Sequence, residues 1–304
     1  MIQSNNVEIH SIGLHKVGNK YMDEPLELST ELINLDDYIK NILVNYFLSK
    51  FNFFELFSLS HQIDVKYNEI FSISQEIFSK RDISVTETVN LAKHLYEQST
   101  HPKIKGGEFY IVYFKDFVVD NKIMDAIGLF KSENKDTFLK IHSKGENFEI
   151  ESESGININK LDKGCLIFNT EKENGYLVAI VDNTNKGSEA KYWTDDFLHV
   201  RPRKDSFNQT QNMLSLCKSF VSQLPSDNGK VEKATYINRS VEALKEESVN
   251  INTFAEQVFE TPELVSEFKQ YKETYQKERD IEIDDTFATA STAIKRRSTS
   301  TMTT

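Results

Sequence analysis

The run of six residues after Gly106-Gly107 constrains the fold most, because Phe109 to Phe114 are all aromatic or β-branched. Residues of these types favour β-strands. Four similar runs follow along the chain, at 123–130, 137–141, 161–168 and 175–181. The polar turn SENKD joins the first two and EKEN the last two, which predicts two hairpins. We therefore expect a largely antiparallel sheet in the middle of the chain.

Apolar residues at helical spacing lie on both sides of these strands. An alternating pattern at 7–14 first predicts an opening strand. Helices are expected at 32–47, 69–78 and 85–96 before the sheet, and at 206–221, 230–245, 252–260 and 262–277 after it. Asp205 or Ser206 can cap the first of the later helices. The fold class is α+β, with N-terminal helices, a largely antiparallel central sheet and a helical C-terminal third.

Four regions follow from this pattern. We expect an N-terminal α/β region at 1–155, a β-hairpin with a basic loop and helix at 156–222, and an acidic helical region at 223–285. Residues 286–304 are rich in Ser and Thr and poor in apolar side chains. Such a composition buries too little surface to offset chain entropy, so we expect a disordered tail there.

Charge is distributed unevenly along the 304 residues, whose net charge is −11. The stretch 196–220 holds four basic and two acidic residues, whereas 230–285 holds eight basic and fourteen acidic ones. Attraction of a polyanion by such a chain requires local clustering of Lys and Arg. No stretch approaches the roughly 18 apolar residues of a membrane span, and Cys165 and Cys217 lie in apolar patterns typical of unpaired core cysteines. A cytoplasmic protein without membrane contact is expected.

Motifs for nucleotide or metal chemistry are absent from the sequence. Neither of the glycine-rich phosphate-binding patterns occurs, and the seven histidines are scattered singly instead of being paired with cysteines at short spacing. We expect no cofactor, no metal and no enzymatic activity.

One alternative is a metal-dependent nuclease built on Asp125, Glu133 and Lys135. Two carboxylates can hold Mg²⁺ while a lysine steadies the attacking water. That arrangement requires the Glu and Lys to project from one face of a strand, whereas SENKD has the composition of an exposed turn. The turn interpretation is favoured, and the nuclease is kept as the alternative.

The segment 191–221 carries the strongest signal for binding. It contains the only Trp, then Arg201, Arg203 and Lys204, and then an amphipathic helix. A helix N-terminus presents free N–H groups and partial positive charge, so these cations could meet a DNA phosphate there. The helix adds further candidates for DNA contact: Gln209, Asn212 and Lys218. The opposing interpretation is that the arginines pair with Asp195, Asp196 or Asp205 and pin the loop.

Several stretches of the chain also resemble a known family. YWTDDFLHVRPRKDSFNQTQNMLSLCKSFV and LDKGCLIFNTEKENGYLVAIVDNTNKGSEAKYW, with GGEFYIVYF and MDAIGLFKSENKDTFLKI, are similar to the bacterial nucleoid-associated YejK-like family, particularly its Bacteroidetes-type members. The resemblance implies a location at the nucleoid, binding of double-stranded DNA with low sequence specificity, and contact with DNA topology enzymes or other nucleoid proteins. It supplies no catalytic residues, and it leaves self-assembly open. A protein-interaction factor that binds no DNA is the other alternative.

Overall fold

The computed structural model describes residues 2–4, 6–184, 191–225, 230–279 and 281–300. The chain forms two compact units, Met1–Arg201 and Pro202–Thr304, which are called unit 1 and unit 2 below. The division falls inside the region 156–222, which the sequence pattern presents as one piece.

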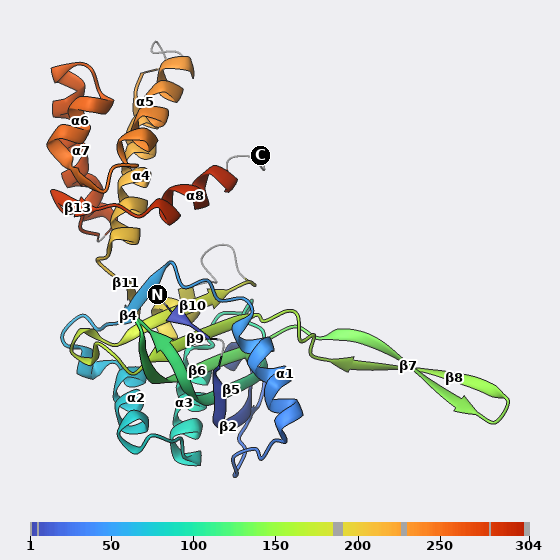
Figure 1. Ribbon diagram of the computed structural model, residues 1–304. Helices are drawn as coiled ribbons and strands as arrows, with labels where there is room; N and C mark the ends of the chain where they lie inside the picture. Colours follow the sequence, from blue (N-terminus) through green and yellow to red (C-terminus); the bar gives the residue numbers. More distant parts are fainter. Residues whose placement is uncertain (1, 5, 185–190, 226–229, 280, 301–304) are drawn as a thin grey trace. The chain divides into compact units, whose positions relative to one another are not determined.

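Unit 1 is built on a nine-stranded sheet with the order β11-β4-β10-β9-β6-β5-β2-β3, in which β1 also pairs with β5 (Figure 1). The pairs β1–β5, β2–β3, β2–β5, β5–β6, β6–β9, β9–β10 and β4–β10 are all antiparallel, as predicted. The strands are β1 Ile2–Gln3, β2 Glu8–Val17, β3 Leu26–Glu27, β4 Leu56–Leu59, β5 Gly107–Val119, β6 Lys122–Ser132, β9 Lys163–Phe168, β10 Leu177–Asp182 and β11 Val200–Pro202.

The central strands are buried on both faces. In β5, Phe109, Ile111 and Tyr113 belong to a core shared with α2 (Glu69–Lys80) and α3 (Val85–Gln98). The alternate residues Tyr110, Val112 and Phe114 belong to a second core, to which α1 (Asp37–Leu48) contributes Tyr46, Phe47 and Leu48. Successive side chains of a strand point to opposite faces, so a continuously apolar strand such as β5 needs helices on both sides.

A β-bulge interrupts β5. The register with β6 shifts between Phe114 and Phe117, and Asp116 has a φ of 66°. The extra residue reverses the alternation, so the rings of Phe114 and Phe117 lie in the same core with centroids 5.8 Å apart. The strand therefore continues past Lys115 and Asp116 to Val119, and the chain turns at Asp120 and Asn121, both of which have positive φ.

The helix predicted at 32–47 begins later than expected. It starts at Asp37, where Asp36 is the N-cap and its side chain accepts a hydrogen bond from Ile39 N at 2.8 Å. Ile33 precedes the helix in an extended segment, where its N–H donates to Ile12 O. Ile33 and Leu35 pack against the core but precede the helix. Because these apolar residues continue the helical spacing, the sequence pattern predicted a longer helix.

The hairpin predicted between 123–130 and 137–141 is wrong. β6 pairs with β5 and β9, while β7 (Asp136–Lys144) pairs only with β8 (Asn147–Gly155) in a separate two-stranded ribbon. This ribbon extends away from the rest of unit 1 (Figure 1). The second hairpin, β9 with β10, is confirmed.

Unit 2 is helical around its own core. Asp205 caps α4 as predicted, and Phe220, Phe254, Phe259 and Phe268 pack in the interior. Within the described residues no helix is long and apolar enough to cross a membrane. The elements are α4 Ser206–Gln223, α5 Lys230–Ala243, β12 Ser248–Asn250, α6 Ile251–Val258, α7 Pro262–Arg279, β13 Thr286–Ala288 and α8 Ser291–Ser300.

The disorder predicted for 286–304 is wrong for the described part of that segment. β13 pairs with β12, with Phe287 opposite Val249, and α8 follows. Phe287 and Ala293 are buried and Ile294 packs against the core of unit 2, so a few apolar residues suffice to hold the segment. Residues 301–304 lie outside the described residues.

Replacing Phe287 by Ala tests this placement. The ring is 7% exposed, so its loss should lower the free energy of unfolding of unit 2 by about 3 kcal/mol or more. The measurement is urea unfolding followed by far-UV circular dichroism. Val231→Ala, at a side chain that is 82% exposed, is the control and should change it by less than about 0.5 kcal/mol. A Phe287→Ala variant as stable as this control would contradict the placement.

Candidate functional site

The basic run predicted to meet DNA is divided between the two units. Arg201 is exposed in β11 at the end of unit 1, whereas Arg203 and Lys204 belong to unit 2. α4 begins two residues after Lys204. Each unit therefore has to be considered for its own cations.

In unit 2, Lys204 is held by two carboxylates. Its Nζ lies 2.7 Å from Asp284 Oδ1 and 3.1 Å from Glu282 Oε1, and the bond to Asp284 is the first reason that the pKa of Lys204 is raised. Gln209 is buried beside it, donating to Glu282 O and accepting from Asp284 N. Lys204 and Gln209 thus fasten the segment at 282–284 to the start of α4.

The N-terminus of α4 is already capped by an anion. The Asp205 carboxylate accepts from Asn208 N at 2.9 Å, and Arg203 Nε lies 4.0 Å from its other oxygen. Burial raises the pKa of Asp205, with the bond from Asn208 opposing that shift. A phosphate would have to compete with this carboxylate for the same amides. Farther along the helix, Asn212 is half-buried and Lys218 is exposed and is the helix's one basic residue.

In unit 1, Arg201 lines an open pocket of about 460 Å³ together with His61, Asp195 and His199. The His61 and His199 rings lie 6.5 Å apart between centroids. His199 has a φ of 48°, and its carbonyl accepts from Ser60 and Asn68, which fix the loop. Burial lowers the pKa of His199, with His94 adding to the shift. Arg201, His61, His199 and Asp195 thus line one pocket, a grouping that the scattered positions of the histidines in the sequence did not reveal.

The alternative nuclease residues do not come together. Asp125 accepts from Tyr113 Oη at 2.7 Å and from Arg81 Nε at 3.2 Å, and Lys135 pairs with Glu108 at 2.6 Å. Glu133 lies just past the end of β6 and follows Asp125 by eight positions, roughly 25 Å at the rise of a strand. In the parts of the chain that the structure describes, no three His, Cys, Asp or Glu side chains are placed to hold a metal ion.

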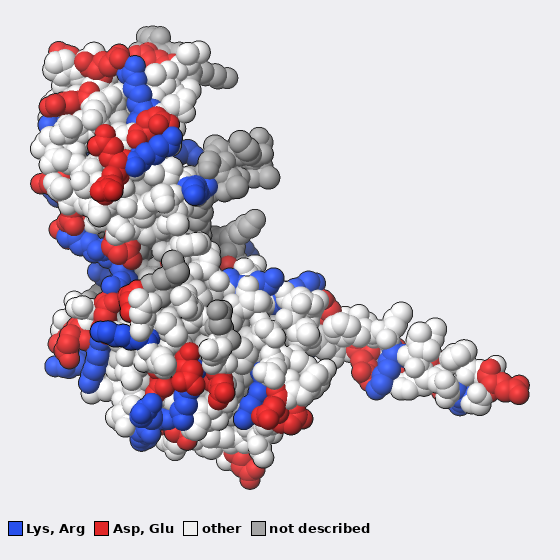
Figure 2. Space-filling view, in the orientation of Figure 1, with Lys and Arg blue, Asp and Glu red and all other residues white. Residues whose placement is uncertain are grey.

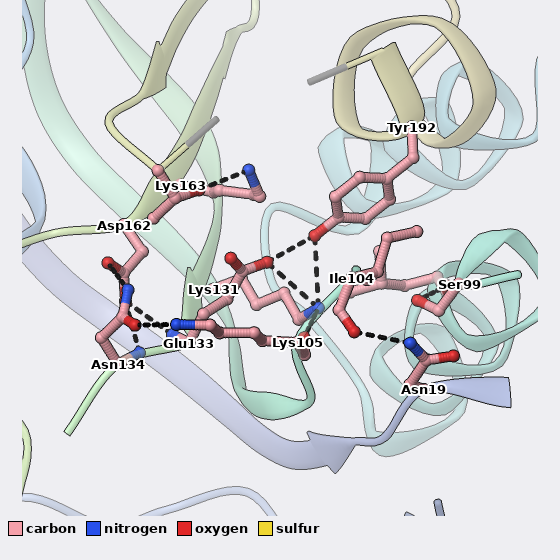
Figure 3. A network of polar contacts seen from close by, with 12 residues as sticks. Asn19, Ser99, Ile104, Lys105, Lys131, Glu133, Asn134, Asp162, Lys163 and Tyr192 are labelled. Atoms are coloured by element: carbon pink, nitrogen blue, oxygen red, sulfur yellow. Dashed lines mark hydrogen bonds and ion pairs between the residues drawn. The ribbon is translucent and has the colours of Figure 1, made fainter. Parts of the chain in front are cut away.

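Glu133 also departs from the exposed turn expected for SENKD, because its side chain is only 4% exposed. It faces a network of buried polar groups at one end of β6 (Figure 3). Asp162 holds the turn from the other side, accepting from Glu133 N, Asn134 N and Asn134 Nδ2. Asn134 and Lys135 are exposed as predicted.

Two fully buried lysines form the centre of this network. Lys131 on β6 and Lys163 on β9 are directly opposite in the sheet register, and their Nζ atoms lie 5.3 and 5.2 Å from the centre of the Tyr192 ring. Lys131 Nζ donates to Lys105 O at 2.7 Å and to Tyr192 Oη at 3.2 Å, and lies 3.3 Å from Glu133 Oε1. Lys163 Nζ donates to Asp182 and Thr184, each at 2.8 Å.

Burial shifts the pKa of two groups of this network, Lys131 and Tyr192. It lowers the pKa of Lys131 against the opposing effect of Glu133, and it raises the pKa of Tyr192 well above its ordinary value. Tyr192 Oη donates a hydrogen bond to Glu133 Oε1 at 2.6 Å, so the phenol and the carboxylate satisfy each other inside the network. The network joins the 104–105 loop, the ends of β6, β9 and β10, and the π-helical turn Tyr192–Phe197. We interpret it as the polar framework of unit 1. One sequence signal could have indicated this network: a lysine lies inside each of two apolar strand runs, Lys131 in GLFKS and Lys163 in DKGCLIF.

Removing one member of this network should reveal the coupling between its charges. Lys131→Met leaves Glu133 buried without its cation and should cost about 3–5 kcal/mol of unfolding free energy, whereas the double variant with Glu133→Gln should lose less than the sum of the two single losses. Urea unfolding followed by fluorescence reports on unit 1, because the only Trp, Trp193, is buried there. Additive losses would show that the two side chains are not coupled.

On the face shown in Figure 2, basic and acidic side chains are interspersed and form no broad field of one sign. Comparison with known proteins identifies the family of the chain, which the geometry of these residues does not. No curated protein matches the chain. The family model described as nucleoid-associated protein YejK matches residues 9–303, nearly the whole length. The chain therefore belongs to the YejK family of nucleoid-associated proteins.

Proposed function

We propose that this protein binds double-stranded DNA at the nucleoid, in the cytoplasm, with low sequence specificity and without cleaving it. Membership of a nucleoid-associated family is the observation that carries the proposal. Given the net charge of −11, we expect the attraction to DNA to come from a few local points, and the face in Figure 2, where basic and acidic side chains are interspersed, accords with this.

The pocket around Arg201 is the best candidate for such a point. Arg201 is exposed and lines the same pocket as His61 and His199, so we infer that a phosphate in the pocket could receive hydrogen bonds from more than one side chain. Asp195 on the same pocket limits the local positive charge. Phosphate contacts fix position and carry no sequence information, which accords with low specificity.

The other candidates for DNA contact belong to unit 2. Lys204 and Gln209 are occupied by the segment at 282–284, and Arg203 adjoins the Asp205 cap. Asn212 and Lys218 stay available as secondary contacts on α4.

The acidic character of 230–285 favours a second role for unit 2. With fourteen acidic against eight basic residues, this stretch should repel DNA and suits contact with proteins that have basic surfaces. We infer that protein partners, such as DNA topology enzymes or other nucleoid proteins, dock on unit 2. If this protein binds partners but no DNA, the docking of partners on unit 2 is its whole function.

The salt dependence of DNA binding separates a phosphate contact from a structural ion pair. Arg201→Ala should lower the slope of log affinity against log salt by about one unit and weaken unrelated duplexes alike, because one counterion-releasing contact is lost. Lys204→Ala should leave the slope nearly unchanged and lower the melting temperature slightly, since it removes exposed ion pairs. Fluorescence anisotropy and thermal melting of both variants measure this.

Lys245→Ala is the matched control. Among the ion pairs of the described residues, Lys245 takes part in one, a surface pair with Glu242. The variant should alter neither quantity. An unchanged slope in Arg201→Ala would contradict the assignment of the Arg201 pocket.

Incubation with Mg²⁺ tests the absence of cleavage. Supercoiled plasmid should stay intact with the protein and Mg²⁺, because Asp125, Glu133 and Lys135 are each engaged with different partners. Gel electrophoresis of the plasmid is the measurement. Mg²⁺-dependent nicking that disappears in Glu133→Gln would show that the protein is a nuclease.

A further inference from the structure

The ribbon formed by β7 and β8 has two chemically different faces. Residues directly opposite in an antiparallel pair share a face, and the face alternates along each strand. One face carries the charged side chains, which form the pairs Lys140 with Glu153, His142 with Glu151 and Lys144 with Glu149. The other face carries no ionisable residue; its members are Thr137, Leu139, Ile141, Ser143, Phe148, Ile150, Ser152 and Ser154.

Four large apolar side chains on the uncharged face are open to solvent. Leu139 is 73% exposed, Ile141 65%, Phe148 75% and Ile150 64%. An isolated two-stranded ribbon is marginally stable in water, and exposed ion pairs such as those on its other face add little. Apolar side chains gathered on one face of such an element indicate a surface that is covered in the working protein.

We propose that this face binds the same face of a second copy of the chain. A face without charge meets itself without repulsion, whereas it offers DNA no cation. The ribbon's other face, with four acidic residues against Lys140 and Lys144, would repel DNA. Dimers of this kind, in which one patch meets itself across a two-fold axis, are the commonest closed assemblies.

The order of side chains along the ribbon fits this pairing. Ile141 is directly opposite Ile150, Leu139 is opposite Ser152, and Phe148 is opposite Ser143. A two-fold axis that crosses the ribbon at the Ile141 and Ile150 pair lays Leu139 of one copy over Ser143 of the other, and Phe148 over Ser152. Leu139 and Phe148 then each meet a serine, and Ile141 and Ile150 each meet their own counterpart at the axis, so the two faces can stack with apolar contact at the centre. This axis points the two ribbons in opposite directions, which keeps the bodies of the two copies apart.

The area of the face sets the strength of the contact. Nine residue pairs with a rise of about 3.3 Å give a ribbon about 30 Å long and on the order of 10 Å wide. Its face therefore covers about 300 Å², well under the roughly 800 Å² that each partner buries in a standard stable complex. The contact should be reversible, with a dissociation constant in the micromolar range or weaker.

Sedimentation velocity of the full chain across the micromolar range tests the proposal. The wild type should pass from monomer to dimer as concentration rises, with little weakening by salt because no ion pair is involved. Ile141→Asp brings two carboxylates together at the axis and should raise the dissociation constant at least about tenfold. Ile63→Asp, at an isoleucine that is 81% exposed outside the ribbon, is the control and should dimerise like the wild type.

Cross-linking provides a second readout in case Ile141→Asp disturbs the ribbon itself. Ile141→Cys should be joined into a covalent dimer by a bis-maleimide with a spacer of roughly 10 Å, the separation of stacked sheets, whereas Lys140→Cys on the opposite face should not. The native Cys165 and Cys217 are buried and should contribute little background. A wild type that stays monomeric throughout, a dimer that Ile141→Asp leaves unchanged, or equal cross-linking at positions 140 and 141 would overturn the proposal.

Discussion

Burial of the central strands on both faces is the constraint on which unit 1 depends. β5 and β6 carry apolar side chains into two cores at once, so each face of the sheet must be covered, by α2 and α3 on one side and by α1 on the other. Where a charged residue lies in such strands, it has to be paired. Lys131 and Lys163 meet this requirement around Tyr192, and in doing so they join the strand ends to the turn that precedes β11.

The same principle separates framework from surface among the charged residues. Lysines that are buried or held by carboxylates, such as Lys131 and Lys204, stabilise the chain and have little capacity left for a ligand. Arg201 is exposed and lines a pocket with His61, His199 and Asp195, which is the point proposed for a phosphate. In a chain with a net charge of −11, the proposed DNA binding would depend on local points of this kind, so a few residues should account for most of the electrostatic attraction.

Sequence patterns predicted the elements whose partners are near in the chain. The aromatic run at 109–114, the hairpin of β9 with β10 and the Asp205 cap were all evident, because alternation and capping are local properties. The partner of β7 was missed, since both β6 and β8 adjoin it and only the packing of β9 against β6 excludes a β6–β7 hairpin. The Arg201 pocket and the lysine pair join residues more than thirty positions apart, as in Lys131 and Lys163, and spacing along the chain carries no signal for that. The described part of 286–304 shows that a few apolar residues, with Phe287 among them, can pack a segment whose composition predicts disorder.

The central claim, that this member of the YejK family binds DNA through a few phosphate contacts, is tested most directly with the wild-type protein and two duplexes of unrelated sequence. Affinity should be measured for both across a range of salt concentrations. The account predicts equal affinities and one shared, shallow slope corresponding to a small number of released counterions. Absence of binding even at low salt, or a strong preference for one duplex that persists at high salt, would contradict it.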